Sequence, residues 1–397
     1  MKETKQKGAA LIIFAVIFAL AATTFLISQL DASGVKIERD KKTSLALAEA
    51  KSALIGDAIS QPLTSEGLLR LPDIGFSTSP SGPSEGSSIA NFIDNNKNYS
   101  VIGKLPWKTL GMAPLKDGYG ECLWYVVSGR FKKNPITDIL NWDTQGQIDV
   151  IDPNGNLIAT NLAALIVAPR FTLENQSRSL EHAAYSQCGG NYDARNYLDA
   201  YNAANALAGE LNYFSSSLNN RVALNANNKT FVLAKNDFYN DQFAFVTVDE
   251  IFNPIIRRKD FSSQVAALLE DDEFKIHLQA ITVVGSKGTG NINCGSIATS
   301  TYNKEFCDNW KEMLLLTQLP PTSSIVINGV NTPCNRLLIF GGKKTIIQAR
   351  ITAANKSDPA NYLEGDNLNA FNTSTADFDG VSEFSVNSPG ADVLRCL

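Results

Sequence analysis

Histidine is scarce in this chain of 397 residues, and common hydrolase signatures are missing. The two histidines, His182 and His277, lie neither in an HExxH zinc motif nor beside a GxSxG serine motif. A nucleophilic pair of His182 with Cys188, six residues further on, is an alternative. Asp271 and Asp272 belong to the run EDDEF, which is typical of a solvated helix end. We therefore predict no enzyme activity, no catalytic residues and no cofactor.

Basic clusters and internal repeats are also missing. The net charge is −5 and the pI is near 5.3, and no basic cluster lies outside residues 1–61. Nucleic acid is therefore not an expected partner. The absence of a fixed repeat argues against a solenoid or a propeller. With 44% hydrophobic residues, the chain is long enough for one large or two smaller domains.

Cysteine is absent before residue 120 and never occurs in a CxxC motif, which argues against zinc and redox sites. The six cysteines are Cys122, Cys188, Cys294, Cys307, Cys334 and Cys396. An even number fits disulfides formed in an oxidising compartment, although six cysteines allow 15 pairings. Cys294 and Cys307 bracket a short loop and are the first expected pair. Cys334 and Cys396 would tie down the C-terminus, which leaves Cys122 and Cys188 for each other; free buried thiols are the alternative.

Charge is missing from a long N-terminal stretch. The 23 residues from Gly8 to Leu30 are all uncharged, enough for a helix that crosses a bilayer. We consider three interpretations of this stretch. The first is a secretory signal peptide cleaved after the small-x-small sequence at 19–21, and the second is a plain single-pass anchor with the leader lysines in the cytoplasm. The third is one helix that continues beyond the membrane, because no proline occurs in residues 35–60.

The third interpretation predicts a transmembrane and stem helix over residues 9–61. Ile37, Leu47, Leu54 and Ala58 recur at spacings compatible with one helical face. Pro62 ends the helix because its ring clashes with the preceding turn. Such a helix is roughly 80 Å long at 1.5 Å per residue, far more than a bilayer requires.

The junction between the leader and the apolar run resembles the N-terminus of type IV pilins and of type II secretion pseudopilins. A polar leader, residues 1–8, ends in Gly8, and the apolar helix begins directly at Ala9. The resemblance implies cleavage between these two residues by prepilin peptidase and methylation of the new N-terminus. It also implies that apolar side chains pack against other pilins or minor pilins in a filament, here Ile13, Phe14, Ile17 and Phe18.

One departure from the pilin pattern narrows the expected role. Major pilins carry a glutamate at the fifth mature residue, and that position is Ile13 here. The large tip pseudopilin and some minor pilins share this absence, which favours a tip or initiator subunit. The stretches LPWKTLG, GECLWYVVSG, DPANYLEG and ADVLRCL also resemble a group of proteobacterial proteins with pilin-like N-termini. That resemblance brings no assigned activity.

The rest of the chain predicts an α+β head over residues 101–397, after a loop rich in Ser, Gly and Asn over residues 62–100. We expect a disulfide-stapled antiparallel sheet with a helical insertion at about residues 175–280. The stretch 147–167 predicts a hairpin followed by a buried strand, and SIVING, RLLIF and TIIQARI predict further strands. Thr247 and Glu250 have capping-box spacing. Asp152, Asn154 and Asn156 have the alternating oxygen spacing that opens a calcium loop, but Gly155 is misplaced for one and no glutamate stands at the twelfth position. We therefore predict a turn and no metal, with calcium binding as the alternative.

These expectations combine into one functional hypothesis. The chain is predicted to be a non-enzymatic minor pilin or pseudopilin, at the tip of a type IV pilus or a type II secretion pseudopilus. It would be held in inner-membrane lipid by a single span, with its head in the periplasm, and it would reach the cell surface at a pilus tip. The alternatives are a membrane-anchored periplasmic binding or adhesion module that never polymerises, and a secreted hydrolase.

Overall fold

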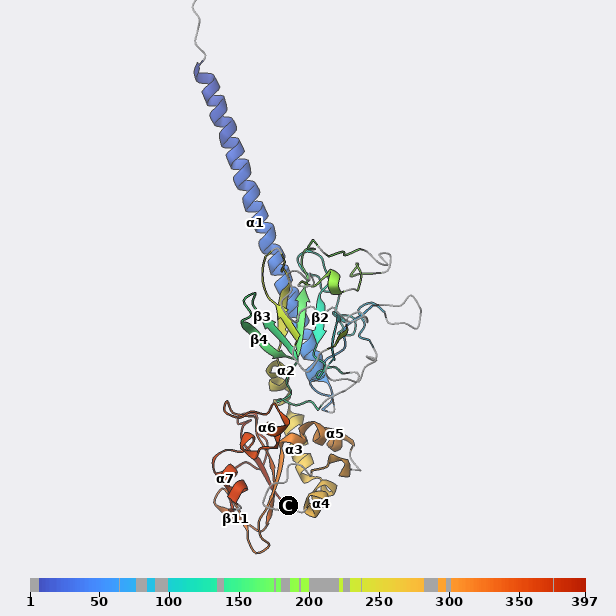
Figure 1. Cartoon of the computed structure of the whole chain (residues 1–397), viewed down its shortest axis with the longest axis vertical. Coiled ribbons are helices and arrows are strands. Elements are labelled where there is room, and N and C mark those ends of the chain that lie inside the picture. Colours follow the sequence, from blue (N-terminus) through green and yellow to red (C-terminus); the bar gives the residue numbers. More distant parts are fainter. Residues whose placement is uncertain are drawn as a thin grey trace, which may run out of the picture.

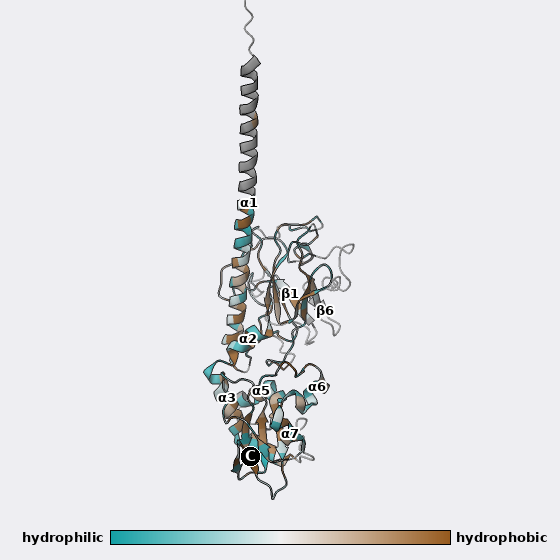
Figure 2. Cartoon of the chain, turned by 90° about the vertical axis from the view of Figure 1, so that its left-hand side faces the viewer, coloured by the Kyte–Doolittle hydropathy of each residue, from teal (hydrophilic) through white to brown (hydrophobic). Residues whose placement is uncertain are grey.

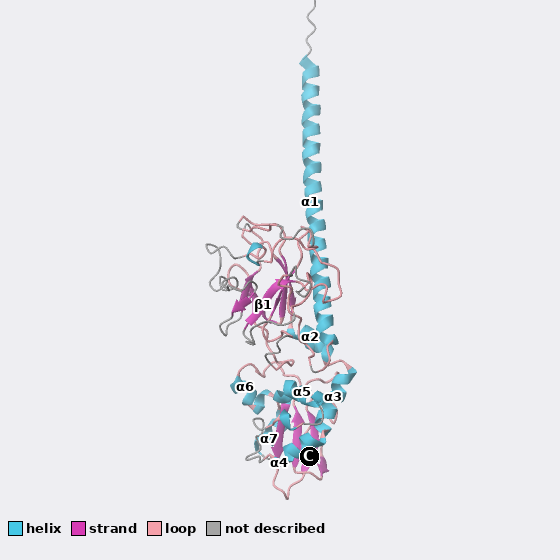
Figure 3. Cartoon of the chain, turned by 90° about the vertical axis from the view of Figure 1, so that its right-hand side faces the viewer, coloured by secondary structure: helices cyan, strands magenta, loops and turns pink. Residues whose placement is uncertain are grey.

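A long helix and two stacked lobes make up the molecule (Figure 1). The computed structural model describes residues 7–63, 65–75, 84–89, 99–133, 139–174, 176–179, 186–192, 194–199, 221–223, 229–236, 238–281, 292–297, 301–373 and 375–397. We call the described parts of residues 62–256 the proximal lobe and those of residues 257–397 the distal lobe. The distal lobe lies at the end of the molecule remote from the start of the helix (Figures 1 and 3).

Helix α1 spans Lys7–Ser60 without a break, close to the predicted 9–61. The prediction of a transmembrane span is nevertheless corrected, because no helix in the described part of the chain is both long and apolar enough to cross a membrane. From Thr43 onward α1 is amphipathic, with one buried face and one exposed face. The side chains of residues 7–32, apart from Phe18, lie outside the described residues. The predicted single-pass location in the inner membrane depended on this span, so that prediction is corrected too.

The proximal lobe is built on a five-stranded antiparallel sheet of order β6-β1-β2-β5-β8. Its strands are β1 (Tyr99–Lys104), β2 (Trp124–Val127), β5 (Ala164–Ala168), β6 (Arg221–Ala223) and β8 (Gln242–Val246). Every residue of β2 and β5 is buried, because both faces of the sheet are covered. One face packs against α1, and the other against a sheet formed by β3 (Ile148–Ile151), β4 (Leu157–Leu162) and β7 (Lys229–Val232). A short 3₁₀ turn, η1 (Ala194–Asn196), packs on that second face.

Helix α2 (Val248–Ile255) follows β8 and joins the two lobes. The predicted capping box is confirmed, since the Thr247 side chain accepts a hydrogen bond from the Glu250 amide and the Glu250 carboxylate accepts one from the Thr247 amide. The predicted hairpin is also confirmed as β3 and β4, and it is followed by the buried strand β5. The first part of the expected helical insertion, about residues 175–220, lies largely outside the described residues.

The distal lobe places helices around two three-stranded sheets, with apolar strands inside (Figure 2). The sheets are β14-β12-β9 and β11-β10-β13, formed by β9 (Leu314–Gln318), β10 (Ile325–Ile327), β11 (Val330–Thr332), β12 (Arg336–Phe340), β13 (Asp377–Phe378) and β14 (Val393–Cys396). The helices are α3 (Lys259–Glu270), α4 (Asp272–Ala280), α5 (Thr301–Trp310), α6 (Ala353–Ser357) and α7 (Gly365–Thr373), with the 3₁₀ turns η3 (Cys294–Ser296), η4 (Lys311–Met313) and η5 (Pro359–Asn361). The predicted strands SIVING and RLLIF are confirmed as β10 and β12.

The predicted strand in TIIQARI is wrong. Residues 345–351 form a turn-rich loop in which two polar side chains, those of Gln348 and Arg350, are buried. Arg350 is fully buried, and Gln348 accepts a hydrogen bond from the Thr345 amide. Ile346 and Ile347 are exposed instead. In this loop the polar residues are buried and the isoleucines exposed, which is the opposite of the pattern expected for a buried strand.

Three disulfides are present, in the pairing we expected. Two lie in the distal lobe: Cys294–Cys307 joins η3 to α5, and Cys334–Cys396 ties the last strand to the segment before β12. The third, Cys122–Cys188, closes the proximal lobe across 66 residues. Each bond stabilises the fold mainly by restricting the unfolded chain.

Candidate functional site

The C-terminal half of α1 packs on the proximal sheet through a stripe of mostly small side chains. The buried residues of this stripe are Thr43, Ala46, Leu47, Ala50, Leu54 and Ala58. They face β5, β8 and α2 within one hydrophobic core. Because β5 also presents alanines on this side, helix and sheet approach closely. This half of the helix is therefore a fixed part of the head.

A loop of the proximal lobe contacts α1 at the point where the helix leaves the sheet. The Gly118 amide donates to the Thr43 hydroxyl at 2.9 Å, and that hydroxyl donates to the Arg39 carbonyl at 2.8 Å. A Cβ at Gly118 would lie 2.2 Å from the same carbonyl oxygen, so only glycine allows this approach. The Tyr119 ring lies 5.0 Å from the Arg39 guanidinium, a cation–π contact.

Ion pairs fix the direction of α1 relative to the head. Asp40 accepts from the buried guanidinium of Arg170 at 2.6 Å. Further down the helix, Lys51 pairs with Glu250 of α2, at the helix cap already described. Near its end, Asp57 accepts two hydrogen bonds from Arg70. These contacts, distributed along the packed half, hold α1 as a rigid extension of the proximal lobe.

On the N-terminal side of these contacts the helix projects from the proximal lobe (Figure 3). Residues 33–38 are exposed on all sides, and they include the apolar Val35 and Ile37. Phe18, nearer the N-terminus, is 75% exposed. Exposed apolar side chains on a helix favour contact with another helix, because covering them removes apolar area from water and stabilises the assembly.

The predicted processing and packing residues lie at the start of α1. Gly8 and Ala9 belong to its first turn by backbone geometry. Their surroundings, and the side chains of Ile13, Phe14 and Ile17, lie outside the described residues. Their roles stay predictions.

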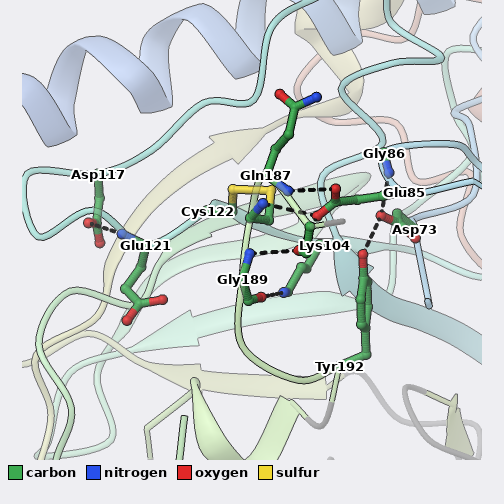
Figure 4. Close-up of a disulfide and its surroundings, with 12 residues drawn as sticks. Asp73, Glu85, Gly86, Lys104, Asp117, Glu121, Cys122, Gln187, Gly189 and Tyr192 are labelled. Carbon is green, nitrogen blue, oxygen red and sulfur yellow. Dashed lines mark hydrogen bonds between the residues drawn. A yellow bond between two sulfur atoms is a disulfide. The ribbon is translucent and has the colours of Figure 1, made fainter. Parts of the chain in front are cut away.

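A second polar site surrounds the Cys122–Cys188 disulfide (Figure 4). Glu85 accepts hydrogen bonds from the Ser186 hydroxyl at 2.6 Å and from the amides of Gln187 and Cys188 at 2.8 and 2.9 Å. The carboxylate and the disulfide thus hold the same loop from two sides. Since Cys188 is bonded to Cys122, it offers no thiolate for the Cys/His alternative, and His182 lies outside the described residues.

Next to this loop, the buried Asp73 and Lys104 form a cluster with the half-buried Tyr192 (Figure 4). Asp73 accepts from the Tyr192 hydroxyl at 3.0 Å and from the amides of Gly75 and Gly86, while burial raises its pKa. The Lys104 ammonium donates to the Gly189 carbonyl at 2.8 Å and lies 4.3 Å from the centre of the Tyr192 ring. All three polar groups are engaged in fixing loops. The cluster therefore has a structural role.

Two buried carboxylates, those of Asp199 and Asp241, connect the segment after η1 to the segment before β8 by hydrogen bonds. Asp199 accepts from the amides of Asn240 and Asp241, and Asp241 accepts from the Asp199 amide at 2.9 Å. Burial raises the pKa of Asp199 to about 6, and burial together with the neighbouring Asp199 carboxylate raises the pKa of Asp241 well above its usual value. The reciprocal backbone bonds give this pair a structural role too.

The predicted turn at Asp152 is confirmed. Its carboxylate accepts from the amides of Asn154 and Asn156 and from the Asn156 side chain. These hydrogen bonds lower the pKa of Asp152. Over the described ranges, no group of three or more His, Cys, Asp or Glu side chains is placed to hold a metal ion.

Sequence reasoning missed the residues where the two lobes meet. Asp143 and Arg350 form a fully buried ion pair of 3.1 Å across 207 positions of sequence. Trp142, beside Asp143, packs edge-on against Trp310 of α5 with ring centres 4.7 Å apart. Neither the run NWDTQG nor the run KKTIIQAR carries a known motif that could have revealed this junction.

Comparisons with known proteins do not add a family to this picture. A scan against protein-family models, a search of curated proteins and a search of solved structures each found no match. Function must therefore be inferred from the helix, the lobes and their surfaces.

Proposed function

We propose that this chain is a non-enzymatic assembly subunit of the pilin type, a minor pilin or pseudopilin at the tip of a type IV pilus or type II secretion pseudopilus. The observation that carries the proposal is the division of α1. Its C-terminal half packs on an antiparallel sheet, and its N-terminal half continues beyond the head as one unbroken helix. A helix held this rigidly at one end presents its other half to neighbouring subunits in a defined direction.

The sequence of the projecting half supports packing against other helices. Its 23 uncharged residues, from Gly8 to Leu30, would be poorly solvated as an isolated helix in water. Helices of neighbouring subunits would cover this surface, and burial of apolar area would supply the free energy of assembly. We infer that Ile13, Phe14, Ile17 and Phe18 take part in this packing after prepilin peptidase removes residues 1–8.

Two features favour the tip. The head is large and extends away from the start of α1, with the distal lobe at the far end (Figure 3). The two lobes would block the addition of a further subunit beyond this one. In addition, Ile13 occupies the position at which major pilins carry a carboxylate that fixes the register of the next subunit.

Site-specific photo-crosslinking tests the proposal. A photoreactive residue replaces Ile37 on the projecting part of α1 in one variant and Ile276 on α4 in the control. The two sites match in exposure, at 68% and 67%. We expect Ile37 to cross-link to proteins that themselves carry a pilin-like apolar N-terminal helix, identified by mass spectrometry, and Ile276 not to do so. Equal cross-linking from both sites, or none from Ile37, would contradict the proposal.

A further inference from the structure

Three segments of the proximal lobe contact α1 at the point where the helix emerges from the head (Figure 3). These segments are residues 117–119, 170–171 and 235–240. The Asp40 carboxylate of α1 joins two of them, because it accepts from Arg170 at 2.6 Å and lies 3.8 Å from the Lys235 ammonium. We call this end of the proximal lobe, together with residues 33–42 of α1, the exit face.

The exit face carries an excess of positive charge. Residues 33–42 of α1 include four basic and two acidic side chains: Lys36, Glu38, Arg39, Asp40, Lys41 and Lys42. Asp40 is already paired with cations of the head. By contrast, Lys36, Lys41 and Lys42 are exposed and form no ion pair with any residue that the structure describes. The net charge of the whole chain is −5, so this face differs in sign from the chain as a whole.

The three lysines lie on different sides of the helix. Because an α-helix turns by about 100° per residue, Lys36, Lys41 and Lys42 are separated by roughly 100 to 140° around its axis. Positive charge therefore surrounds α1 where it leaves the proximal lobe. A partner that approaches along the projecting half of α1 meets an ammonium group from any side.

Exposed aromatic side chains lie beside this charge. Phe171 is 46% exposed and Phe238 is 50% exposed. The Phe171 ring lies 5.6 Å from that of Tyr119, and the Tyr119 ring lies 5.0 Å from the Arg39 guanidinium. Phe238 belongs to the segment 235–240, which donates a hydrogen bond to the Phe171 carbonyl. Large aromatic side chains left in water are typical of surfaces that a partner protein covers.

We propose that the exit face docks onto a carboxylate-rich surface on the head of the adjacent assembly subunit. The inference rests on the proposed function. A neighbour whose helix packs along the projecting half of α1 carries its own head beside that half, so the exit face is the part of this chain that the neighbouring head meets first. Opposite charges would steer the approach and fix the orientation. Phe171 and Phe238 would add buried apolar area.

Zero-length cross-linking with a water-soluble carbodiimide tests this inference. The reagent activates a carboxylate, and a lysine amine in contact attacks the activated carbonyl, so that an amide forms and a urea leaves. Mass spectrometry identifies the linked peptides in filament fractions that contain the full chain. We expect Lys36, Lys41 or Lys42 to be linked to Asp or Glu residues of another chain that carries a pilin-like N-terminal helix.

Charge reversal tests the same contact independently, with a photoreactive residue at Phe238 as the reporter. Lys41→Glu combined with Lys42→Glu should lower the yield of cross-linking to the neighbouring head about tenfold, because like charges then face each other. Lys259→Glu combined with Lys275→Glu, on α3 and α4 of the distal lobe, changes the net charge equally and should leave the yield unchanged. Unchanged melting temperatures would show that both double variants fold.

Three outcomes would overturn the inference. The first is the absence of carbodiimide links from the exit face while Ile37 still cross-links to pilin-like helices, which would leave the proposed function intact. The second is an equal loss of Phe238 cross-linking in the two double variants, which would be a general effect of net charge. The third is that the exit face yields no carboxylate links but holds the wild type on vesicles of anionic phospholipid, which would make it a lipid-binding surface. Failure of Ile37 to cross-link would contradict the proposed function, and the inference with it.

Discussion

Replacing Glu66 with glutamine is expected to make the stability of the protein much less dependent on pH. Glu66 is fully buried where the lobes meet, and its Oε1 accepts from the Trp310 indole at 3.3 Å. Its second oxygen has no hydrogen-bond partner among the described residues. Burial raises the pKa of Glu66 from 4.5 to about 8, although the nearby Arg258 opposes this shift. At neutral pH the carboxyl is therefore protonated in the folded protein.

The direction of the pH effect follows from proton binding. Between pH 4.5 and about 8 the folded state holds a proton on Glu66 that the unfolded state has lost. Stability is therefore greatest below this window, falls as pH rises through it and is lowest above it. The slope is about 1.4 kcal/mol per pH unit, so the contribution of Glu66 changes by roughly 4 kcal/mol between about pH 5 and pH 8.

Chemical denaturation across this pH range measures the effect. We expect the unfolding free energy of the wild type to fall by roughly 4 kcal/mol more than that of Glu66→Gln over the range. Other buried carboxylates, such as Asp392 with a pKa of about 6, titrate in both proteins and cancel in the difference. Glu49→Gln, an exposed site on α1, is the control and should follow the wild type. Parallel pH profiles for the wild type and Glu66→Gln would show that Glu66 is not protonated in the folded state.

Replacing Arg350 with methionine is expected to destabilise the protein by about 3 to 5 kcal/mol, because it leaves a buried carboxylate without its partner. Arg350 and Asp143 each have 1% of their side chain exposed and are 3.1 Å apart. The guanidinium also lies 4.3 Å from the Tyr362 ring and donates to the carbonyls of Gly342 and Asn361. Loss of Arg350 would therefore leave several buried acceptors unpaired.

Two further variants separate the ion pair from general packing damage. Asp143→Asn combined with Arg350→Met should recover part of the loss, since the uncompensated charge is removed. Lys304→Met breaks an ion pair of similar length to Asp308, 2.9 Å, whose side chains are 42% and 41% exposed. That change should cost no more than about 1 kcal/mol. Equal losses in Arg350→Met and Lys304→Met, measured by denaturant unfolding, would contradict the role given to the buried pair.

Features set by neighbouring residues were predictable from the sequence. The absence of proline from residues 35–60 and the presence of Pro62 predicted the extent of α1. The spacing of Thr247 and Glu250 predicted the N-terminal cap of α2. The turn at Asp152 gave the β3–β4 hairpin. In each case the physical determinant, a hydrogen bond or a steric clash, acts within a few residues of the chain.

Apart from the disulfide pairing, features set by distant residues were not predictable. TIIQARI was expected to form a strand because of its isoleucines, but Arg350 is drawn inward by Asp143, which lies 207 positions away. In the same loop, Ile346 and Ile347 are exposed. The length of the apolar run likewise suggested a membrane span. The helix described by the structure does not meet that criterion, and its amphipathic half is committed to the proximal sheet.

The mature N-terminus tests the assembly account most directly. Mass spectrometry of protein isolated from filament fractions identifies the first residue, in the wild type and in a variant with Gly8 replaced by leucine. The account predicts Ala9, N-methylated, for the wild type and an uncleaved chain absent from filaments for the variant. A wild-type chain that begins at Met1 or Ala22, or filament fractions without this protein, would contradict it.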